Sequence, residues 1–193
     1  MTPTDPADKV LREIEEIGER SFIPSIGPEK GKVLAKVVRE KKPKRILEVG
    51  ALYGYSAILM AKNAPQSTVT TVEMSPENAK VTMSNVKRAG LEGRITVIEG
   101  DGAKVLPKLQ GPFDLVFLDA NKSQYLAYLK AVEKKLPKGG VVVADNVGIF
   151  RDEMLDFLEY VRRTGLYKSR TVETLLEFST TEKDAMEISE KIS

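Results

Sequence analysis

The order of apolar and polar residues predicts two helices, followed by strands that alternate with further helices. Apolar positions at helical spacing predict helices over 6–21 and 29–41, joined by a loop over 22–28. Short runs of branched apolar residues predict five strands, at 46–49, 68–72, 95–98, 113–118 and 141–144. The segments between and after these strands predict helices that begin at Ser56, Pro76, Ala103, Lys122 and Asp152.

The end of the chain has a different pattern. Segments 166–171 and 174–179 predict two short strands joined by a hairpin turn, and the polar tail from Thr181 predicts a frayed end or one helix. Strands that alternate with helices imply an α/β fold, with a doubly wound, Rossmann-like, mostly parallel sheet between helices. We expect a single domain over 1–193, with N-terminal helices at 1–43, a core at 44–165, and a strand pair and tail at 166–193.

The composition narrows the chemistry. The chain has no cysteine and no histidine, which excludes Ser-His-Asp and Cys/His catalysis, zinc fingers and disulfide scaffolds. Any metal must then be held by oxygen atoms, which favours a hard cation such as magnesium. No apolar run is long enough to cross a membrane, and the polar start MTPTDPADKV is unlike a secretory signal. We therefore expect a cytoplasmic protein.

The net charge is only +2, but the charges are unevenly distributed. Residues 30–45 hold eight basic side chains and one acidic side chain, Glu40. This basic run fits a solvated helix face followed by a linker better than an RNA-binding surface, although it keeps RNA open as an alternative partner.

The stretch over 45–56, RILEVGALYGYS, predicts a buried strand, a tight glycine turn and the start of a helix. A dinucleotide fingerprint needs a glycine where this chain has Leu52, so an NAD-type oxidoreductase is disfavoured. Glu48 at the strand end suits a ligand with a cationic part, such as S-adenosylmethionine, which carries an ammonium and a sulfonium. The alternative is a glycine-broken turn that binds no ligand.

Acidic residues also follow the later strands. Glu73 lies twenty-three residues beyond Gly50, where an acid can accept hydrogen bonds from ribose hydroxyls. Asp101, with Gly102 and Ala103 after it, follows the third strand and is a candidate for binding the adenine amino group.

Two further strands end in possible metal ligands. Asp119 follows the fourth strand, and Asp145 and Asn146 follow the fifth. Neighbouring strand ends can bring two carboxylates and an amide oxygen to one octahedral cation, although each acid alone could simply cap a helix. Lys122 lies close to the same edge, and a nearby cation would push it toward its neutral form, in which it could act as a general base.

Four motifs, LEVGALYGYS, VEMSPE, FLDANKSQY and VVADNV, resemble in order and spacing the cation-dependent S-adenosylmethionine O-methyltransferases, and among these the catechol O-methyltransferases and caffeoyl-CoA O-methyltransferases. The resemblance covers about 22–190. It implies a seven-stranded sheet whose last strand is antiparallel. It also implies transfer of a methyl group to one hydroxyl of a catechol or another vicinal diol in a small molecule.

The resemblance assigns a role to each site residue. Lys122 would be the catalytic base, and Asp119, Asp145 and Asn146 would bind Mg²⁺ or another divalent cation. The acceptor would meet Lys122, Asn146 and Glu177. The cofactor S-adenosylmethionine would be bound by Ile26, Glu48, Gly50, Tyr53, Ser56, Glu73, Asp101, Gly102, Ala103 and Asp119.

The sequence also departs from the catechol enzymes. Ala120 and Asn121 replace a His-Trp pair, Phe22 replaces a tryptophan wall, and the segment after Asn146 lacks a proline. The acceptor pocket is therefore expected to be more open, with Phe150 or Arg151 as further contacts. The alternative function is methylation of a hydroxylated tRNA uridine by the same fold. Some relatives are monomers and others are dimers, so the resemblance leaves both a monomer and a homodimer open.

Overall fold

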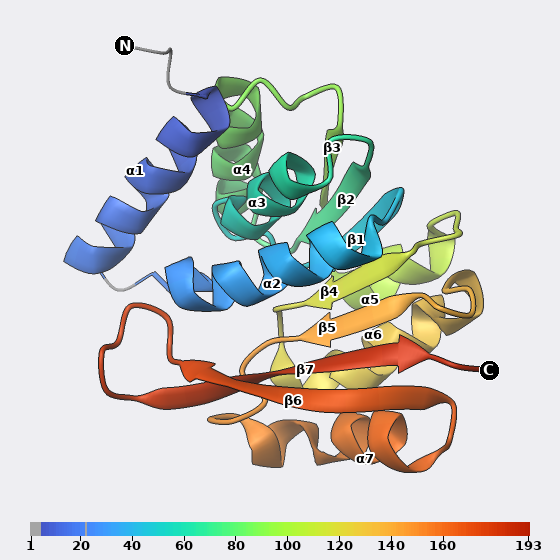
Figure 1. The fold of residues 1–193 in the computed structure, drawn as a ribbon. Helices are drawn as coiled ribbons and strands as arrows, with labels where there is room; N and C mark the ends of the chain where they lie inside the picture. Colours follow the sequence, from blue (N-terminus) through green and yellow to red (C-terminus); the bar gives the residue numbers. More distant parts are fainter. Residues whose placement is uncertain (1–4, 22) are drawn as a thin grey trace.

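The computed structural model of the protein describes residues 5–21 and 23–193 (Figure 1). One sheet of seven strands crosses the molecule in the order β3-β2-β1-β4-β5-β7-β6. The first five strands pair in parallel, and β7 is antiparallel to both of its neighbours. The predicted α/β sheet with an antiparallel last strand is therefore confirmed. The strands are β1 (Arg45–Val49), β2 (Thr68–Glu73), β3 (Ile95–Glu99), β4 (Leu115–Leu118), β5 (Val141–Ala144), β6 (Tyr167–Leu175) and β7 (Lys183–Lys191).

Helices cover both faces of the sheet (Figure 1). One face packs against α1 (Pro6–Arg20), α2 (Gly27–Lys41), α3 (Tyr55–Asn63) and α4 (Pro76–Arg88). The other face packs against α5 (Gly102–Val105), α6 (Tyr125–Val132) and α7 (Leu155–Arg163). Four short 3-10 helices complete the set: η1 (Leu106–Lys108), η2 (Lys122–Gln124), η3 (Glu133–Lys135) and η4 (Arg151–Met154). The helix predicted to begin at Lys122 is thus a succession of η2, α6 and η3.

Side-chain caps explain where two of the helices begin. Asp5 accepts a hydrogen bond from the Ala7 amide at 2.9 Å, and Pro6 occupies the first turn of α1. Ser75 accepts from the Asn78 amide at 3.2 Å in the same way at the start of α4. These contacts satisfy amides that have no partner inside the helix.

The prediction for the end of the chain was wrong in its boundaries. The segment around Val172, where a hairpin turn was expected, is instead part of β6, and Val172 pairs with Met186 of β7. The segment predicted as a frayed or helical tail is instead β7, which inserts between β5 and β6. The buried polar residues of β7 explain the difference, because their partners are distant in sequence: Glu187 pairs with Arg162, and the Ser189 hydroxyl bonds that of Ser169 at 2.9 Å.

The topology brings the chemically interesting strand ends together. β1 lies between β2 and β4, and β4 lies beside β5, so Gly50, Asp119 and Asp145 all follow adjacent parallel strands at one edge. Ligands of open α/β sheets bind at this edge, where the strand order reverses. None of the helices in 5–21 and 23–193 combines the length and apolar character that a membrane crossing requires.

Candidate functional site

A cavity of about 860 Å³ opens at the carboxyl ends of the parallel strands. Of the fourteen site residues predicted from the sequence, ten line it: Ile26, Gly50, Ser56, Glu73, Asp101, Gly102, Asp119, Lys122, Asn146 and Glu177. The other four, Glu48, Tyr53, Ala103 and Asp145, do not. Phe22, predicted to form a wall of the pocket, lies outside the described residues.

The glycine turn after β1 gives the cavity a backbone wall. Gly50 has a φ of 97°, and a Cβ atom there would lie 2.2 Å from the carbonyl oxygen of Asp119, so only glycine fits. Glu73 fixes the turn from the end of β2, because its Oε2 accepts from the amides of Ala51 at 3.0 Å and Leu52 at 2.8 Å. The Glu73 carboxylate is thereby held at the edge of the cavity.

The residues after β3 divide their roles. Asp101 Oδ1 accepts from the Ala103 amide at 2.9 Å, which caps α5, while the second carboxylate oxygen takes no part in this cap. Gly102 is buried against Tyr128 and Val49, and the side chain of Ala103 is exposed outside the cavity. Asp101 and Gly102 therefore contact the cavity directly, whereas Ala103 contributes only an amide to the cap.

Glu48 is a buried carboxylate under the turn. It is 0% exposed, and neither carboxylate oxygen has a hydrogen-bond partner among the described residues. Burial raises the pKa of Glu48 to about 7.

Tyr53 packs on the core with its ring, and Tyr55 lines the cavity in its place, with its hydroxyl donating to Glu15 of α1.

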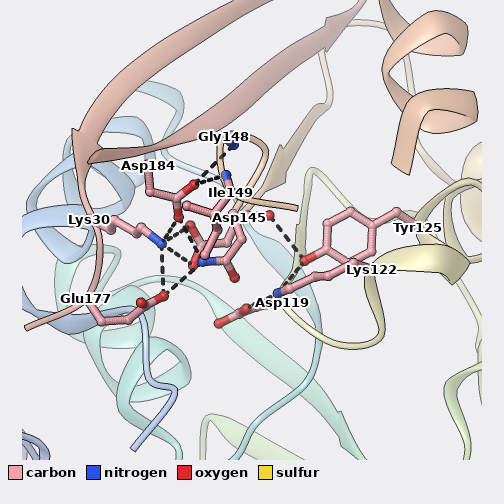
Figure 2. Close-up of polar contacts among 10 residues, drawn as sticks. Lys30, Asp119, Lys122, Tyr125, Asp145, Gly148, Ile149, Glu177 and Asp184 are labelled. Carbon is pink, nitrogen blue, oxygen red and sulfur yellow. Dashed lines mark hydrogen bonds and ion pairs between the residues drawn. The ribbon is translucent and has the colours of Figure 1, made fainter. Parts of the chain in front are cut away.

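Lys122 is held by Asp119, at the end of β4, and by Tyr125, at the start of α6 (Figure 2). Its Nζ donates to Asp119 Oδ1 at 2.9 Å and lies 3.0 Å from the hydroxyl of Tyr125, which in turn lies 3.4 Å from the Asp145 carbonyl oxygen. Burial alone would lower the pKa of Lys122, but the carboxylates of Asp119 and Asp145 raise it above its ordinary value. In the protein without ligands Lys122 is therefore a cation, and the neutral form expected beside a bound cation and a sulfonium stays a prediction.

A second lysine, Lys30 of α2, lies at the centre of three carboxylates (Figure 2). Its Nζ donates to Asp145 Oδ2 at 3.2 Å and to Glu177 Oε1 at 3.0 Å, and lies 2.5 Å from Asp184 Oδ2. Lys30 is 0% exposed, so the expectation of a solvated basic face fails at this position. Burial alone would lower the pKa of Lys30, but the three carboxylates raise it well above its ordinary value.

Asn146 is oriented by the same cluster. Its Nδ2 donates to Glu177 Oε1 at 2.9 Å and to Asp184 Oδ2 at 2.8 Å. Both amide hydrogens are thus used, and the carbonyl oxygen remains as the group that Asn146 can offer to a ligand. Its backbone lies in the left-handed region, with a φ of 59°, a conformation that asparagine tolerates better than most residues.

The oxygen atoms near Asp145 fit a hard cation. Both carboxylate oxygens of Asp145 are buried against the Lys30 ammonium, Oδ1 at 3.0 Å and Oδ2 at 3.2 Å, and burial raises the pKa of this side chain to about 7. Within residues 5–21 and 23–193, no three His, Cys, Asp or Glu side chains converge as a metal cage. The predicted set contains only two carboxylates, Asp119 and Asp145, and the amide of Asn146, a donor chemistry that magnesium accepts together with water or substrate oxygens.

Sequence reasoning missed Lys30, Asp184, Tyr55 and Tyr125. A signal for Lys30 existed, because it lies four residues before Leu34 and seven before Val37, on the apolar stripe of α2. Asp184 gave no local signal, because its partners are Lys30 and the amides of Gly148 and Ile149.

The comparisons with known proteins agree with this geometry. Residues 4–156 match the family described as O-methyltransferase. Catechol O-methyltransferase of Sus scrofa is 36% identical over 162 residues, which cover 80% of this chain and 86% of that protein. The Bos taurus catechol O-methyltransferase is 35% identical over 169 residues, covering 83% of this chain but only 61% of the bovine protein, less than two thirds of its length.

Solved structures give the same result. The O-methyltransferase TomG from Streptomyces achromogenes, in complex with S-adenosylmethionine, superposes with a TM-score of 0.85 at 25% identity, covering 96% of this chain and 91% of TomG. A putative O-methyltransferase from Klebsiella pneumoniae has a TM-score of 0.83 at 29% identity and covers 100% of this chain and 93% of its own. The strand order, the glycine turn and these matches lead to one conclusion: the chain belongs to the O-methyltransferase family.

Proposed function

We propose that this protein transfers the methyl group of S-adenosylmethionine to one hydroxyl of a vicinal diol, such as a catechol, with the help of a divalent cation. One observation carries the proposal. Asn146 uses both amide hydrogens on Glu177 and Asp184, so it can offer only its carbonyl oxygen, in the cavity that Asp119 also lines. Both follow strands that border the cavity containing Gly50 and Glu73.

The cofactor would lie along the glycine turn. S-adenosylmethionine supplies the methyl group when it is bound. Glu73 would accept hydrogen bonds from its ribose, and Asp101 from its adenine amino group. Glu48 does not line the cavity, so we assign it no direct contact with the cofactor. Its negative charge would act from below the turn and favour the cationic methionine part. The complex of TomG with S-adenosylmethionine supports this cofactor for a chain of the same fold.

Asp119, Asp145 and Asn146 would hold the cation. When bound, it would supply positive charge that lowers the pKa of an acceptor hydroxyl. Glu177 also lines the cavity, and its carboxylate would accept a hydrogen bond from the second hydroxyl of the diol. A diol held at two points is oriented for attack, whereas a monophenol lacks the second contact.

Lys122 would accept the proton of the reacting hydroxyl. Its Nζ lies beside Asp119, whose charge keeps the lysine protonated in the ligand-free protein. Once the Asp119 carboxylate is engaged elsewhere, this stabilisation weakens and positive charge nearby favours the neutral amine. Tyr125 would keep the amine in place through its hydroxyl.

The acceptor wall is small on one side and apolar on the other. Ala120 and Asn121 line the cavity where the catechol enzymes have larger rings, and Ile149 and Phe150, which follow Asn146, also line it. Ile149 is 43% exposed and Phe150 is 38% exposed, so apolar surface is available to a flat ring. Arg151 is exposed but does not line the cavity.

The decisive experiment measures methyl transfer from labelled S-adenosylmethionine to catechol, with phenol as the monohydroxyl control. We expect methylated catechol with added Mg²⁺, loss of product with a chelator, and recovery when Mg²⁺ is returned in excess. The Asp119→Asn variant should lose activity, while the matched Asp114→Asn variant, which changes an acid at the opposite end of β4, should retain it. If catechol is methylated at the same rate with and without the chelator, the reaction does not need a divalent cation and this part of the proposal is refuted.

The tRNA alternative gains no support from the position of the basic run. Apart from Lys30, its lysines and arginines lie on α2 and at the amino end of β1, where Arg45 is bound to the carbonyl oxygens of Gln110 and Gly111. The cavity lies beyond the other end of β1, at Gly50. A polyanion held by Lys41, Lys44 and Arg45 would therefore contact the edge of the sheet away from the candidate site.

A further inference from the structure

We infer that Lys30 is a positioning residue, whose buried ammonium holds Glu177 and Asn146 in the places where an acceptor diol can meet them. The inference rests on the proposed function for the identity of the acceptor. Lys30 itself does not line the cavity, so it acts through the residues that it binds.

The first step is the arrangement of charge. Lys30, Asp145 and Asp184 are almost fully buried, and Glu177 is 8% exposed. Three carboxylates this close together repel one another strongly in a low-dielectric interior. The ammonium contacts all three, and without it the carboxylates would have to separate, protonate or admit water.

The second step is the connection to the chain that carries Glu177. Glu177 lies in the 176–182 loop between β6 and β7, where no regular element fixes it. Lys30 Nζ holds the Glu177 carboxylate, and a Cβ on Gly27 would lie 3.2 Å from the Glu177 backbone, so the first turn of α2 presses directly on this loop. Phe178 packs closely on Gly18 of α1 in the same way. The N-terminal helices thus act as the support of the loop.

The third step is the orientation of Asn146. Its amide hydrogens go to the same two carboxylates, Glu177 and Asp184, that Lys30 holds. Asp184 Oδ1 also accepts from the amides of Gly148 at 3.1 Å and Ile149 at 3.0 Å. One ammonium therefore sets the carbonyl of Asn146, the carboxylate of Glu177 and the start of the acceptor wall at Ile149. Figure 2 shows Lys30 facing Glu177 and Asp184.

The cofactor side does not depend on these contacts. The turn after β1 is fixed by Glu73, and Asp101 is fixed by its cap on Ala103. Loss of the ammonium should therefore change acceptor binding and leave cofactor binding nearly unchanged. A residue that only stabilised the fold would affect neither in the folded protein.

The test compares Lys30→Gln with Lys36→Gln, which makes the same change at an exposed position of the same helix. For Lys30→Gln, we expect the KM for catechol to rise about tenfold, equivalent to about 1.4 kcal/mol of lost binding. The Kd for S-adenosylhomocysteine, measured by calorimetry, should change by less than about twofold. Lys36→Gln should match the wild type in both measurements.

Hydrogen exchange gives a readout that needs no acceptor. In Lys30→Gln, peptides covering 145–150 and 175–183 should exchange faster, because they contain the amides ordered by the cluster, while the peptide covering 49–56 should not change. A wild type that fails to methylate catechol would refute the proposed function alone, and this exchange pattern would still decide the inference.

Chemical rescue supplies the second variant. The chain has no cysteine, so Lys30→Cys can be alkylated at that position alone with 2-bromoethylamine in denaturant and then refolded, which restores an ammonium of nearly the same length. Rescue of the exchange pattern and the KM would support the inference. An unchanged KM and exchange pattern in Lys30→Gln would overturn it, as would uniformly faster exchange across the chain. The inference would also be overturned if Lys30→Gln and unmodified Lys30→Cys fail to fold and only the aminoethylated protein folds, because the ammonium would then be needed for folding alone.

Discussion

Replacing Glu48 with glutamine should make the ligand-free protein more stable above neutral pH. Glu48 is fully buried under the glycine turn, and its carboxylate oxygens have no hydrogen-bond partner among residues 5–21 and 23–193. Glutamine keeps the size of the side chain and cannot ionise. The substitution therefore removes the buried charge with little change in packing.

The magnitude follows from the pKa. Burial raises the pKa of Glu48 from 4.5 to about 7, and at 1.36 kcal/mol for each pKa unit this difference corresponds to about 3 kcal/mol. The folded protein binds more protons than the unfolded chain between these two values, so the free energy of unfolding falls as the pH rises from about 4.5 to about 7. The glutamine variant lacks this loss, and its advantage should grow from near zero at the acidic end to about 3 kcal/mol above pH 7.

The assay is urea unfolding of both proteins across this pH range. Glu92→Gln provides the matched control, because it makes the same change at an exposed carboxylate. Its difference from the wild type should stay small and nearly independent of pH. We also expect Glu48→Gln to weaken binding of S-adenosylhomocysteine, whose ammonium would lose a favourable charge.

A stability difference between Glu48→Gln and the wild type that is constant with pH would refute the reasoning. So would a glutamine variant that is less stable than the wild type in alkaline solution. Either result would mean that the Glu48 carboxylate is solvated or paired in solution, and its ionisation would not be linked to folding in the way its burial implies.

Three further predictions concern the cavity. Gly50→Ala should destabilise the fold by about 2–4 kcal/mol in urea unfolding, because the new Cβ meets the Asp119 carbonyl at 2.2 Å and the φ is positive; an unchanged urea midpoint would contradict the clash. Asp145→Asn should weaken Mn²⁺ binding, followed by electron paramagnetic resonance, by about tenfold or more, whereas equal affinity would remove Asp145 from the cation site. Phe150→Ala should raise the KM for catechol by about three- to tenfold, with the Kd for S-adenosylhomocysteine unchanged, and a normal KM would place the acceptor elsewhere.

The parts of the fold that a local pattern determines were predictable. The first five strands are short apolar runs that end at glycine or acid, and the cap at Ser75 uses contacts within three residues. Parallel neighbours then had to bring the ends of β1, β4 and β5 to one edge. The glycine turn and the acids at that edge followed from this alone.

The remaining features depend on partners that lie far away in sequence. β7 looks like a polar tail because Glu187 and Ser189 are buried only together with Arg162 and Ser169. Lys30 is one lysine among eight basic residues in its run, and only its position on the apolar stripe of α2 distinguishes it. The protonated state of Lys122 is similar, because its pKa depends on carboxylates that the fold places around it.

The position of β7 between β5 and β6 has a consequence for synthesis on the ribosome. β6 precedes β7 along the chain but cannot join the sheet until β7 is present, because β7 separates it from β5. Until residues 183–191 have emerged, the nascent chain therefore exposes the apolar β5 as an open edge. Lys30 is synthesised early, but its ion pair with Asp184 can form only after residue 184 has emerged. The acceptor side of the cavity is thus among the last parts of this protein to form.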